Sequence, residues 1–286
     1  MVPKPFKSFE SIGSQRDRYM KKRISTLILL TTFILAGCQD DESPIVATDP
    51  KLDYYLESFD LDGLGFDPQI KVTYEYDSDG KVTKYTVFSY NPNVGSLHEL
   101  NNFVFSYVNN RVDQIKGYFA NKDIPHVEYS YVYLADGRVS KISEKNTAAG
   151  VNSEANFSYD AADNSVKVAY TFSNGGSFEY IFFSNDGNIL SDKTTKGSQL
   201  CSDGEYTYDQ HINPFNNLGY VDYSLTNVSA NNKLTEDVNY VACAFPTLVP
   251  ESHTYEYDEK GYPTIVNTFY KSGSPSAKAR KELFYK

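Results

Sequence analysis

The residues best suited to chemistry are few and scattered. His98, His126, His211 and His253 are the only histidines, and none lies in a His-Glu-x-x-His pattern or at ligand-like spacing from another. The sequence has no Gly-x-Ser-x-Gly elbow and no Gly-rich phosphate loop. Its Asp and Glu residues are too many for spacing to reveal a catalytic pair. The sequence therefore predicts no metal site, no cofactor and no catalytic residue.

One stretch superficially resembles a calcium loop, Asp77-Ser78-Asp79-Gly80. An EF-hand needs a Glu at the twelfth position, which is Phe88 here. Residues 74–83 fit a β-hairpin better. Two tyrosines spaced two apart share one strand face, Asp and Gly supply the turn, and a β-branched and aromatic strand returns.

This hairpin recurs along the chain. The repeat anchors are the tyrosines Tyr74, Tyr76, Tyr131, Tyr133, Tyr159, Tyr206, Tyr208, Tyr255 and Tyr257. The second aromatic of each copy falls at positions 76, 107, 133, 159, 183, 208 and 257, in steps of 31, 26, 26, 24, 25 and 49. A period near 25 residues indicates a repeat architecture. The last step predicts one further, degenerate unit within residues 223–240.

The tyrosines are the remaining candidates for a binding surface. The chain has 25 Tyr, 18 Phe and no Trp. On the strand face toward a core they pack, with hydroxyls reaching the rim, whereas on an exposed face they could form a ligand platform. Their regular recurrence favours packing, because a repeat fold needs a repeated core residue.

The predicted fold follows from these hairpins. Residues 51–286 form a single all-β domain, an antiparallel β-meander of repeated hairpins, while helical periodicity is nearly absent. A meander of this length is either a curved open sheet or barrel-like, and closure would remove its edges. The pattern leaves this choice open.

Residues 1–37 are predicted to be a signal peptide. A basic cluster at 21–23 precedes an apolar run at 24–35, which is too short to span a bilayer as a mature helix. The run ends in Leu-Ala-Gly-Cys38, which resembles a bacterial lipobox, so Cys38 is the predicted lipid attachment. Met20 is the predicted true start. The alternative is an uncleaved N-terminal anchor.

Residues 38–50 are predicted to be a tether. Gln39, Asp40, Asp41 and Glu42 resemble the export signal of Bacteroidetes lipoproteins, although a short acidic run is also typical of a solvated linker. The export interpretation places the protein on the outer membrane, lipid-anchored and facing outward. Removing the seven basic and two acidic residues of 1–37 leaves 20 basic and 35 acidic ones, a formal charge of −15. This excludes a basic footprint for nucleic acid.

Two cysteines remain in a compartment that permits disulfides. Cys201 and Cys243 flank the irregular part of the repeats, where the turns are longest. They are either a disulfide or two small buried hydrophobes.

The Tyr-x-Tyr-Asp-x-x-Gly hairpins resemble the YD repeats of Rhs-type proteins. Together with the lipobox and the acidic leader, they look like those of YD-repeat-like surface lipoproteins of Bacteroidetes. The resemblance covers nearly the whole chain. It implies the fold and a location at the cell surface, but no activity. Rhs proteins use far longer arrays to build a shell, so only the hairpin is expected here.

Two functions from different classes follow. The first is a non-enzymatic, surface-displayed module that binds a glycan, a peptide or an envelope protein partner. The second is a hydrolase or lyase acting on extracellular polymer through a groove of acids and tyrosines. Convergence of His and carboxylates with shifted pKa values in one pocket would favour the enzyme, whereas shallow aromatic concavities would favour binding. A structural role in envelope assembly is a third possibility.

Overall fold

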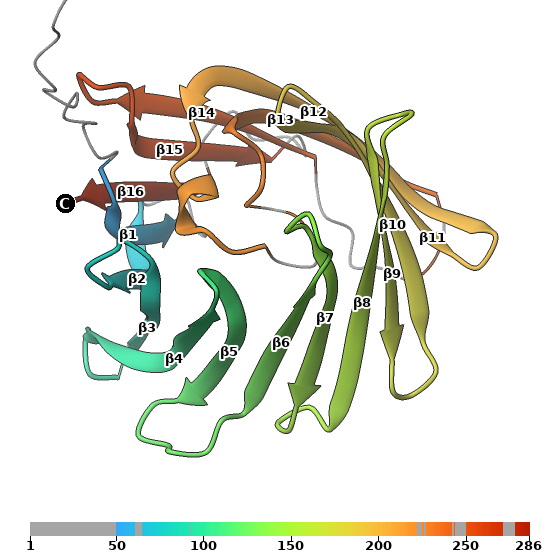
Figure 1. The fold of residues 1–286 in the computed structure, drawn as a ribbon. Coiled ribbons are helices and arrows are strands. Elements are labelled where there is room, and N and C mark those ends of the chain that lie inside the picture. Colours follow the sequence, from blue (N-terminus) through green and yellow to red (C-terminus); the bar gives the residue numbers. More distant parts are fainter. Residues whose placement is uncertain are drawn as a thin grey trace, which may run out of the picture. The chain divides into compact units, whose positions relative to one another are not determined.

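The computed structural model describes residues 50–60, 65–91, 93–221, 225, 227–241, 243, 250–270 and 278–286. Each strand pairs antiparallel with the next along the chain, and the first pairs with the last, so the sheet closes into a barrel (Figure 1). This confirms the predicted all-β meander and decides between open sheet and barrel. The strands are β1 (Leu52–Phe59), β2 (Asp67–Tyr76), β3 (Val82–Asn91), β4 (Ser96–Val108), β5 (Arg111–Phe119), β6 (Val127–Tyr133), β7 (Val139–Asn146), β8 (Val151–Asp160), β9 (Ser165–Phe172), β10 (Ser177–Asn185), β11 (Asn188–Lys196), β12 (Gln199–Ile212), β13 (Asn231–Tyr240), β14 (Glu251–Tyr257), β15 (Pro263–Tyr270) and β16 (Ala279–Tyr285).

Most of the repeat hairpins share one β-bulge, although β8–β9 has none. In β2–β3, Tyr76 pairs with Val82 while Glu75 pairs with Lys84, so Thr83 is the extra residue. The same bulge occurs in β4–β5, β6–β7, β10–β11, β12–β13 and β14–β15, and between β16 and β1. A bulge bends its strand and strengthens the local twist, which helps the sheet to curl until its edges meet.

A tyrosine clamp joins each unit to the one before it. The hydroxyl of Tyr133 donates to the carbonyl oxygen of Val112 at 2.7 Å, and the guanidinium of Arg111 lies 5.5 Å from the ring centre. A lysine or arginine also covers the ring of Tyr76, Tyr107 and Tyr159. Where a basic residue and valine follow the motif Gly, after Gly80 and Gly137, they thus hold the tyrosine of the next unit. Other hydroxyl–carbonyl pairs are Tyr76–Leu52, Tyr107–Val82, Tyr159–Val139, Tyr208–Ile189 and Tyr285–Pro263, whereas the hydroxyl of Tyr257 donates to Asp209.

The turn glycine serves this clamp as well as the turn. Gly137 has φ 96°, which favours glycine, and a Cβ there would lie 2.7 Å from a guanidinium nitrogen of Arg111. Gly80, with φ 85°, bears the same relation to Lys51, at 2.6 Å from its Nζ. The basic residue of one unit therefore lies across the turn of the next.

One unit is divided between the two ends of the chain. Tyr285 pairs with Leu52, and Lys51 and Lys286 exchange backbone hydrogen bonds of 3.2 and 3.0 Å. Conversely, the expected degenerate unit at 223–240 is wrong, because β13 pairs directly with both β12 and β14. The additional length lies in the connections on either side of β13.

The anchor at Phe183 is also misplaced by one residue. In β10–β11 the bulge falls between Phe183 and Ser184, so Ser184 takes the clamp position. Its hydroxyl donates to the carbonyl oxygen of Asn164 at 3.0 Å, and buried Phe182 takes the inner aromatic position. A one-residue slip moves a side chain to the opposite face, which is why the neighbouring aromatic misleads.

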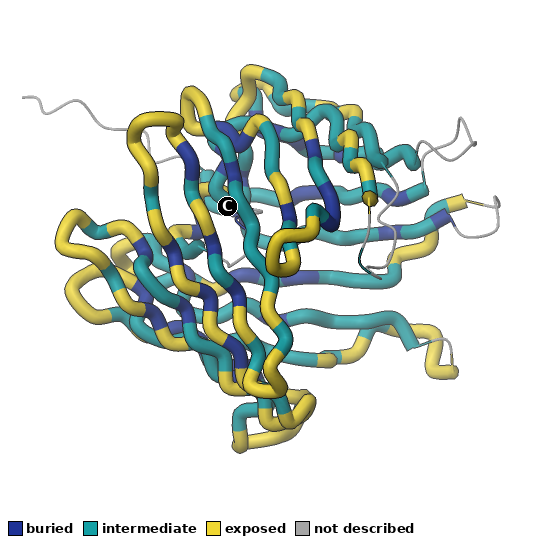
Figure 2. Tube along the Cα trace, turned by 90° about the vertical axis from the view of Figure 1, so that its right-hand side faces the viewer, coloured by how far each residue is buried: buried dark blue, intermediate teal, exposed yellow. Residues whose placement is uncertain are grey.

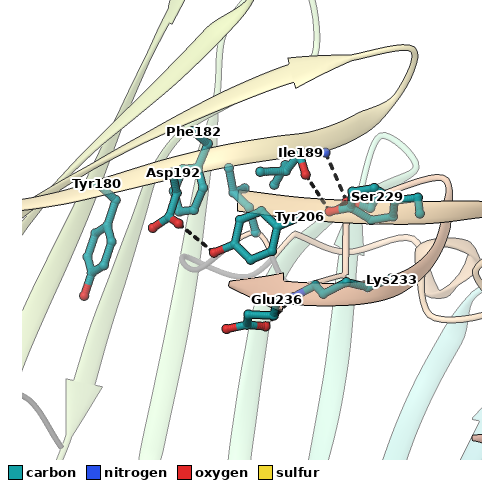
Figure 3. Close-up of a pocket in the computed structure, with 10 residues that line it drawn as sticks. Tyr180, Phe182, Ile189, Asp192, Tyr206, Ser229, Lys233 and Glu236 are labelled. Carbon is teal, nitrogen blue, oxygen red and sulfur yellow. Dashed lines mark hydrogen bonds and ion pairs between the residues drawn. The ribbon is translucent and has the colours of Figure 1, made fainter. Parts of the chain in front are cut away.

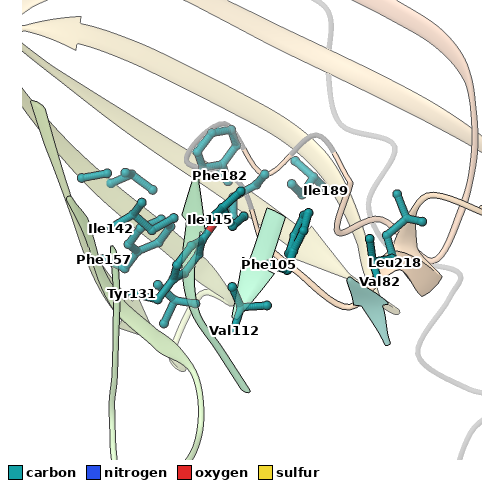
Figure 4. Close-up of a cluster of buried hydrophobic side chains, with 14 of the residues drawn as sticks. Val82, Phe105, Val112, Ile115, Tyr131, Ile142, Phe157, Phe182, Ile189 and Leu218 are labelled. Carbon is teal, nitrogen blue, oxygen red and sulfur yellow. The ribbon is translucent and has the colours of Figure 1, made fainter. Parts of the chain in front are cut away.

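The two faces of the sheet differ in polarity. Buried and exposed residues alternate along the strands (Figure 2), and the inner face carries an aliphatic and aromatic cluster that includes Phe105, Tyr131 and Phe157 (Figure 4). The outer face of the hairpins carries lysine–carboxylate pairs, such as Lys84–Glu75 at 3.4 Å. Further pairs are Lys141–Glu154, Lys145–Glu128 and Lys167–Glu179. Among the described residues, no helix is long and apolar enough to cross a membrane.

The described residues of the connection from β12 to β13, which are 213–221, 225 and 227–230, turn into the barrel (Figure 1); we call them the inward segment. It contains the 3-10 helix η1 (Asn216–Leu218) (Figure 1). Phe215 contacts the ring of Tyr55 at 5.8 Å, and Tyr220 contacts that of Phe105 at 5.2 Å. The hydroxyl of Tyr131 donates to the backbone of the segment at 3.1 Å. The segment thus fills part of the lumen against strands across the barrel.

Candidate functional site

The repeat defines which side chains face the lumen. Each return strand has an inward position three residues beyond the residue that pairs with the clamp position, and most units place an aromatic or aliphatic residue there. These residues are Tyr55, Tyr85, Ile115, Ile142 and Val266. On β11 and β13 the same positions hold Asp192 and Glu236, and Lys233, which pairs with Tyr208, stands where other units have an apolar residue. The repeat is therefore broken by three charged residues on neighbouring hairpins.

These three residues meet at a cavity of about 200 Å³ (Figure 3). The hydroxyl of Tyr206, on β12, donates to Oδ1 of Asp192 at 2.6 Å. Lys233 Nζ lies 2.8 Å from Oε2 of Glu236 and 4.6 Å from the ring centre of Tyr206. The rest of the lining comes from the barrel wall and the inward segment: Tyr180, Phe182, Ile189, Tyr208, Leu225 and Ser229.

A glycine makes room for the central pair. Gly204 is the cross-strand partner of Asp192, and a Cβ on it would clash with Oδ1 of Asp192 and lie 2.9 Å from the hydroxyl of Tyr206. Glycine in a strand interior weakens the strand, so this position is explained by the side chains packed over it. β12 is held to this part of the barrel by the inward segment as well, because Ser229 bonds the hydroxyl of Tyr208 at 3.1 Å.

The negative charges of the carboxylates at the cavity are only partly compensated by hydrogen-bond donors and positively charged side chains. Burial raises the pKa of Asp192, and the hydrogen bond from Tyr206 only partly opposes this. Burial, with the nearby Asp192 carboxylate, also raises the pKa of Tyr206, so its hydroxyl stays protonated and donates. Lys233 pairs with Glu236, whereas the described residues offer Asp192 no lysine or arginine within ion-pair distance.

The polar wall continues onto β14, β16 and β1. Glu251 is the cross-strand neighbour of Glu236, and burial together with that carboxylate raises its pKa. Burial and nearby Lys233 lower the pKa of His253 from 6.5 to about 4, so the imidazole is neutral at neutral pH. Lys281 and Glu57 form a pair at 3.5 Å. One side of the lumen is thus charged, whereas the opposite side is mainly aromatic and aliphatic, with Glu144 as an exception that accepts hydrogen bonds from Ser153 and Tyr170.

The residues singled out by the sequence lie in different parts of the structure. Of the repeat anchors, Tyr206 and Tyr208 line the cavity, and Tyr74 and Tyr131 are buried in the core. Cys201 and Cys243 form a disulfide with an S–S distance of 2.03 Å. Cys38, Gln39, Asp40, Asp41 and Glu42 lie outside the described residues.

The histidines do not gather at the cavity. His126 stacks on Phe119 and His211 stacks on Tyr257, both outside the cavity lining. In the described part of the chain, no group of three or more His, Cys, Asp or Glu side chains could hold a metal ion.

The sequence reasoning missed Asp192, Lys233 and Glu236, although a signal was present. Aligning the return strands on their first inward residue, rather than the outgoing strands on their tyrosines, isolates these positions as charged exceptions in an apolar column. The bulge hid that column, because it changes the alternation within each return strand.

Fold and site together define a closed antiparallel β-barrel with a partly filled lumen and one charged inner wall. This chain is similar to a porin-like protein from Bacteroides uniformis, with a TM-score of 0.53 and 12% identity, over 82% of this chain and 96% of that one. It also aligns with a porin-like protein from Bacteroides vulgatus at 14% identity, over 83% and 99% of the two chains, but a TM-score of 0.45 is too low to support a comparison. No family model matches the sequence, and no curated protein matches it significantly. The first likeness shows a shared fold.

Proposed function

We propose that this chain is a surface lipoprotein of the Bacteroidetes type that binds a small ligand inside its barrel. The observation that carries the proposal is the cavity where Asp192, Lys233 and Glu236 take inward positions that are apolar in most other units. Charged side chains are rarely placed in a lumen for stability alone, because each must be desolvated. A ligand that uses these groups gives a reason for their presence.

The distribution of polar and apolar side chains supports a barrel whose outer face contacts water. A membrane-spanning barrel presents an apolar band outward and a polar lumen inward. Here the lumen holds Phe105, Tyr131 and Phe157, and the outer face carries ion pairs such as Lys141–Glu154. The inward segment also occupies part of the lumen. We therefore propose that a lipid on Cys38 holds the domain at the outer membrane and that the barrel does not form a pore.

The anchor can be tested by cell fractionation and protease treatment of intact cells. A Cys38→Ala protein is expected to leave the outer-membrane fraction, and one that remains there would contradict the lipid anchor. Replacing Asp40, Asp41 and Glu42 by Ala is expected to abolish cleavage by external protease while lipidation persists. Unchanged cleavage would mean that these acidic residues are part of a linker and do not direct export.

Ligand binding can be tested by screening the purified domain, from residue 51 on, against glycans, amino acids and short peptides. A ligand that occupies the cavity should raise the melting temperature of the domain, and Gly204→Leu should abolish this effect, because the larger side chain displaces the Asp192–Tyr206 pair. The cavity is smaller than the ~300–1,000 Å³ typical of drug-sized ligands, so the ligand is of monosaccharide or amino-acid size.

A hydrolase or lyase is the second candidate function. Asp192, Glu251 and His253 have shifted pKa values on one wall, which favours an enzyme, although only Asp192 of the three lines the cavity. The size of this cavity, about 200 Å³, argues against a polymer substrate, because a polymer chain does not fit in it. Release of reducing ends from polysaccharides, lost in Asp192→Asn, would support the enzyme over the binding module.

A further inference from the structure

We infer that the cavity between β10 and β13 selects a small molecule that carries a protonated amine on an apolar or ring-shaped body. This inference rests on the proposed function, since it names the class of ligand that the same cavity binds. It follows from the Asp192 carboxylate in the cavity wall and from the aromatic and aliphatic side chains beside it.

The Asp192 carboxylate has an acceptor that no described residue uses. Tyr206 donates to Oδ1 of Asp192 at 2.6 Å, and no described residue donates to Oδ2 of this carboxylate, which lines the cavity. Lys233 lines the same cavity but is paired with Glu236 at 2.8 Å. A donor that enters the cavity therefore finds one carboxylate oxygen without a partner among the described residues, while the nearby lysine is held by a different carboxylate.

The charge of the wall is also unbalanced. Among the described residues, the nearest ion-pair partner of Glu251 is Nε2 of His253 at 3.9 Å, and this imidazole is neutral at neutral pH. Lys281 is paired with Glu57. Among the described residues, neither Asp192 nor Glu251 has a lysine or arginine at ion-pair distance, although Lys233 acts on both from farther away. An ammonium group on a ligand in the cavity would give Asp192 such a partner, where the low dielectric strengthens the attraction.

The apolar lining of the cavity lies beside the charged pair. Phe182 is the cross-strand partner of Asp192, and Figure 3 shows Tyr180 and Phe182 next to that carboxylate. Ile189 from β11 and Leu225 from the inward segment complete this lining. Aromatic faces attract cations, so these rings tolerate an ammonium group and also bury a hydrocarbon. A neutral sugar or alcohol of the same size would contact the rings but would leave the Asp192 carboxylate without a cation at ion-pair distance.

The test compares matched amines and alcohols. Cyclohexylamine and benzylamine, against cyclohexanol and benzyl alcohol, are titrated into the folded barrel by calorimetry near neutral pH. We expect each amine to bind at least about tenfold more tightly than its alcohol. Asp192→Asn, which keeps the shape of the side chain and an acceptor for Tyr206, should remove most of that preference. Glu205→Gln removes a charge from the outer face of β12 and should leave it unchanged.

Three results would overturn the inference: equal affinity for amine and alcohol, no measurable binding of any amine, or an amine preference that survives in Asp192→Asn. Circular dichroism and melting temperature show whether each variant is folded. If amines fail while a neutral glycan from the wider screen raises the melting temperature, the proposed function stands and only the ligand class is wrong. If no compound in either set binds, both fail.

Discussion

Replacing Tyr133 by Phe tests whether the tyrosine clamp stabilises the barrel. The substitution removes one hydrogen bond of 2.7 Å to the carbonyl of Val112, a residue that is only 2% exposed, and keeps the ring beneath Arg111. Losing such a bond and leaving a buried acceptor costs about 1–2 kcal/mol. For a domain of this size, that lowers the melting temperature by roughly 2–8 °C.

The assay is urea unfolding followed by far-UV circular dichroism and by tyrosine fluorescence, since the chain has no Trp. Tyr118→Phe is the matched control, because Tyr118 lies on neighbouring β5 and no described residue bonds its hydroxyl. It should stay within about 0.5 kcal/mol of the parent. Equal midpoints for the Tyr133 and Tyr118 variants would refute the clamp as a source of stability.

Three further substitutions test the disulfide and the charged wall. Replacing Cys201 and Cys243 by Ser opens a link across 42 residues, which should cost up to ~4 kcal/mol in urea unfolding, and the parent under reducing agent should match the variant. His253→Gln should flatten part of the pH dependence of stability. The pKa of His253 is about 4 in the folded protein, whereas its ordinary value is 6.5. The unfolded chain therefore binds this proton first, and the free energy of unfolding falls by ~2–3 kcal/mol as the pH drops from the ordinary pKa toward the folded one. An unchanged pH profile in the variant would contradict a buried neutral imidazole. Asp192→Asn should raise the melting temperature near neutral pH, because the folded pKa of Asp192 is raised and its charge opposes folding once ionised. That gain should shrink as acid protonates the parent, and a lower melting temperature at neutral pH would mean that the carboxylate is compensated.

Local sequence predicts the hairpins well because their chemistry is local. Tyr74 and Tyr76 lie on one strand face, and the turn that follows has glycine at φ 85°. What local pattern cannot supply is the partner of each tyrosine. The hydroxyl of Tyr76 bonds the carbonyl of Leu52, 24 residues away, in the preceding unit. Closure of the barrel depends on such contacts and on bulges that leave no composition signal.

The site lies further beyond local reasoning. Asp192 and Glu236 look like ordinary members of an acidic chain until the bulge sets which face they take. Lys233 belongs to a strand whose hairpin contains the inward segment, and this insertion was mistaken for another repeat. The long connection of this unit was visible in the sequence, but whether it lay outside the barrel or filled it depended on where Phe215 and Tyr220 could bury their rings.

The unit divided between the chain ends makes the barrel a candidate for circular permutation. Lys51 and Lys286 already exchange backbone hydrogen bonds, so a short turn could join them, and new termini could be opened at any of the Asp-Gly turns. Each permutant would keep all its strand neighbours while moving the N-terminal leader, on which we propose a lipid, to another point on the rim. The orientation of the charged wall relative to a membrane could then be changed by the choice of termini, without changing the fold.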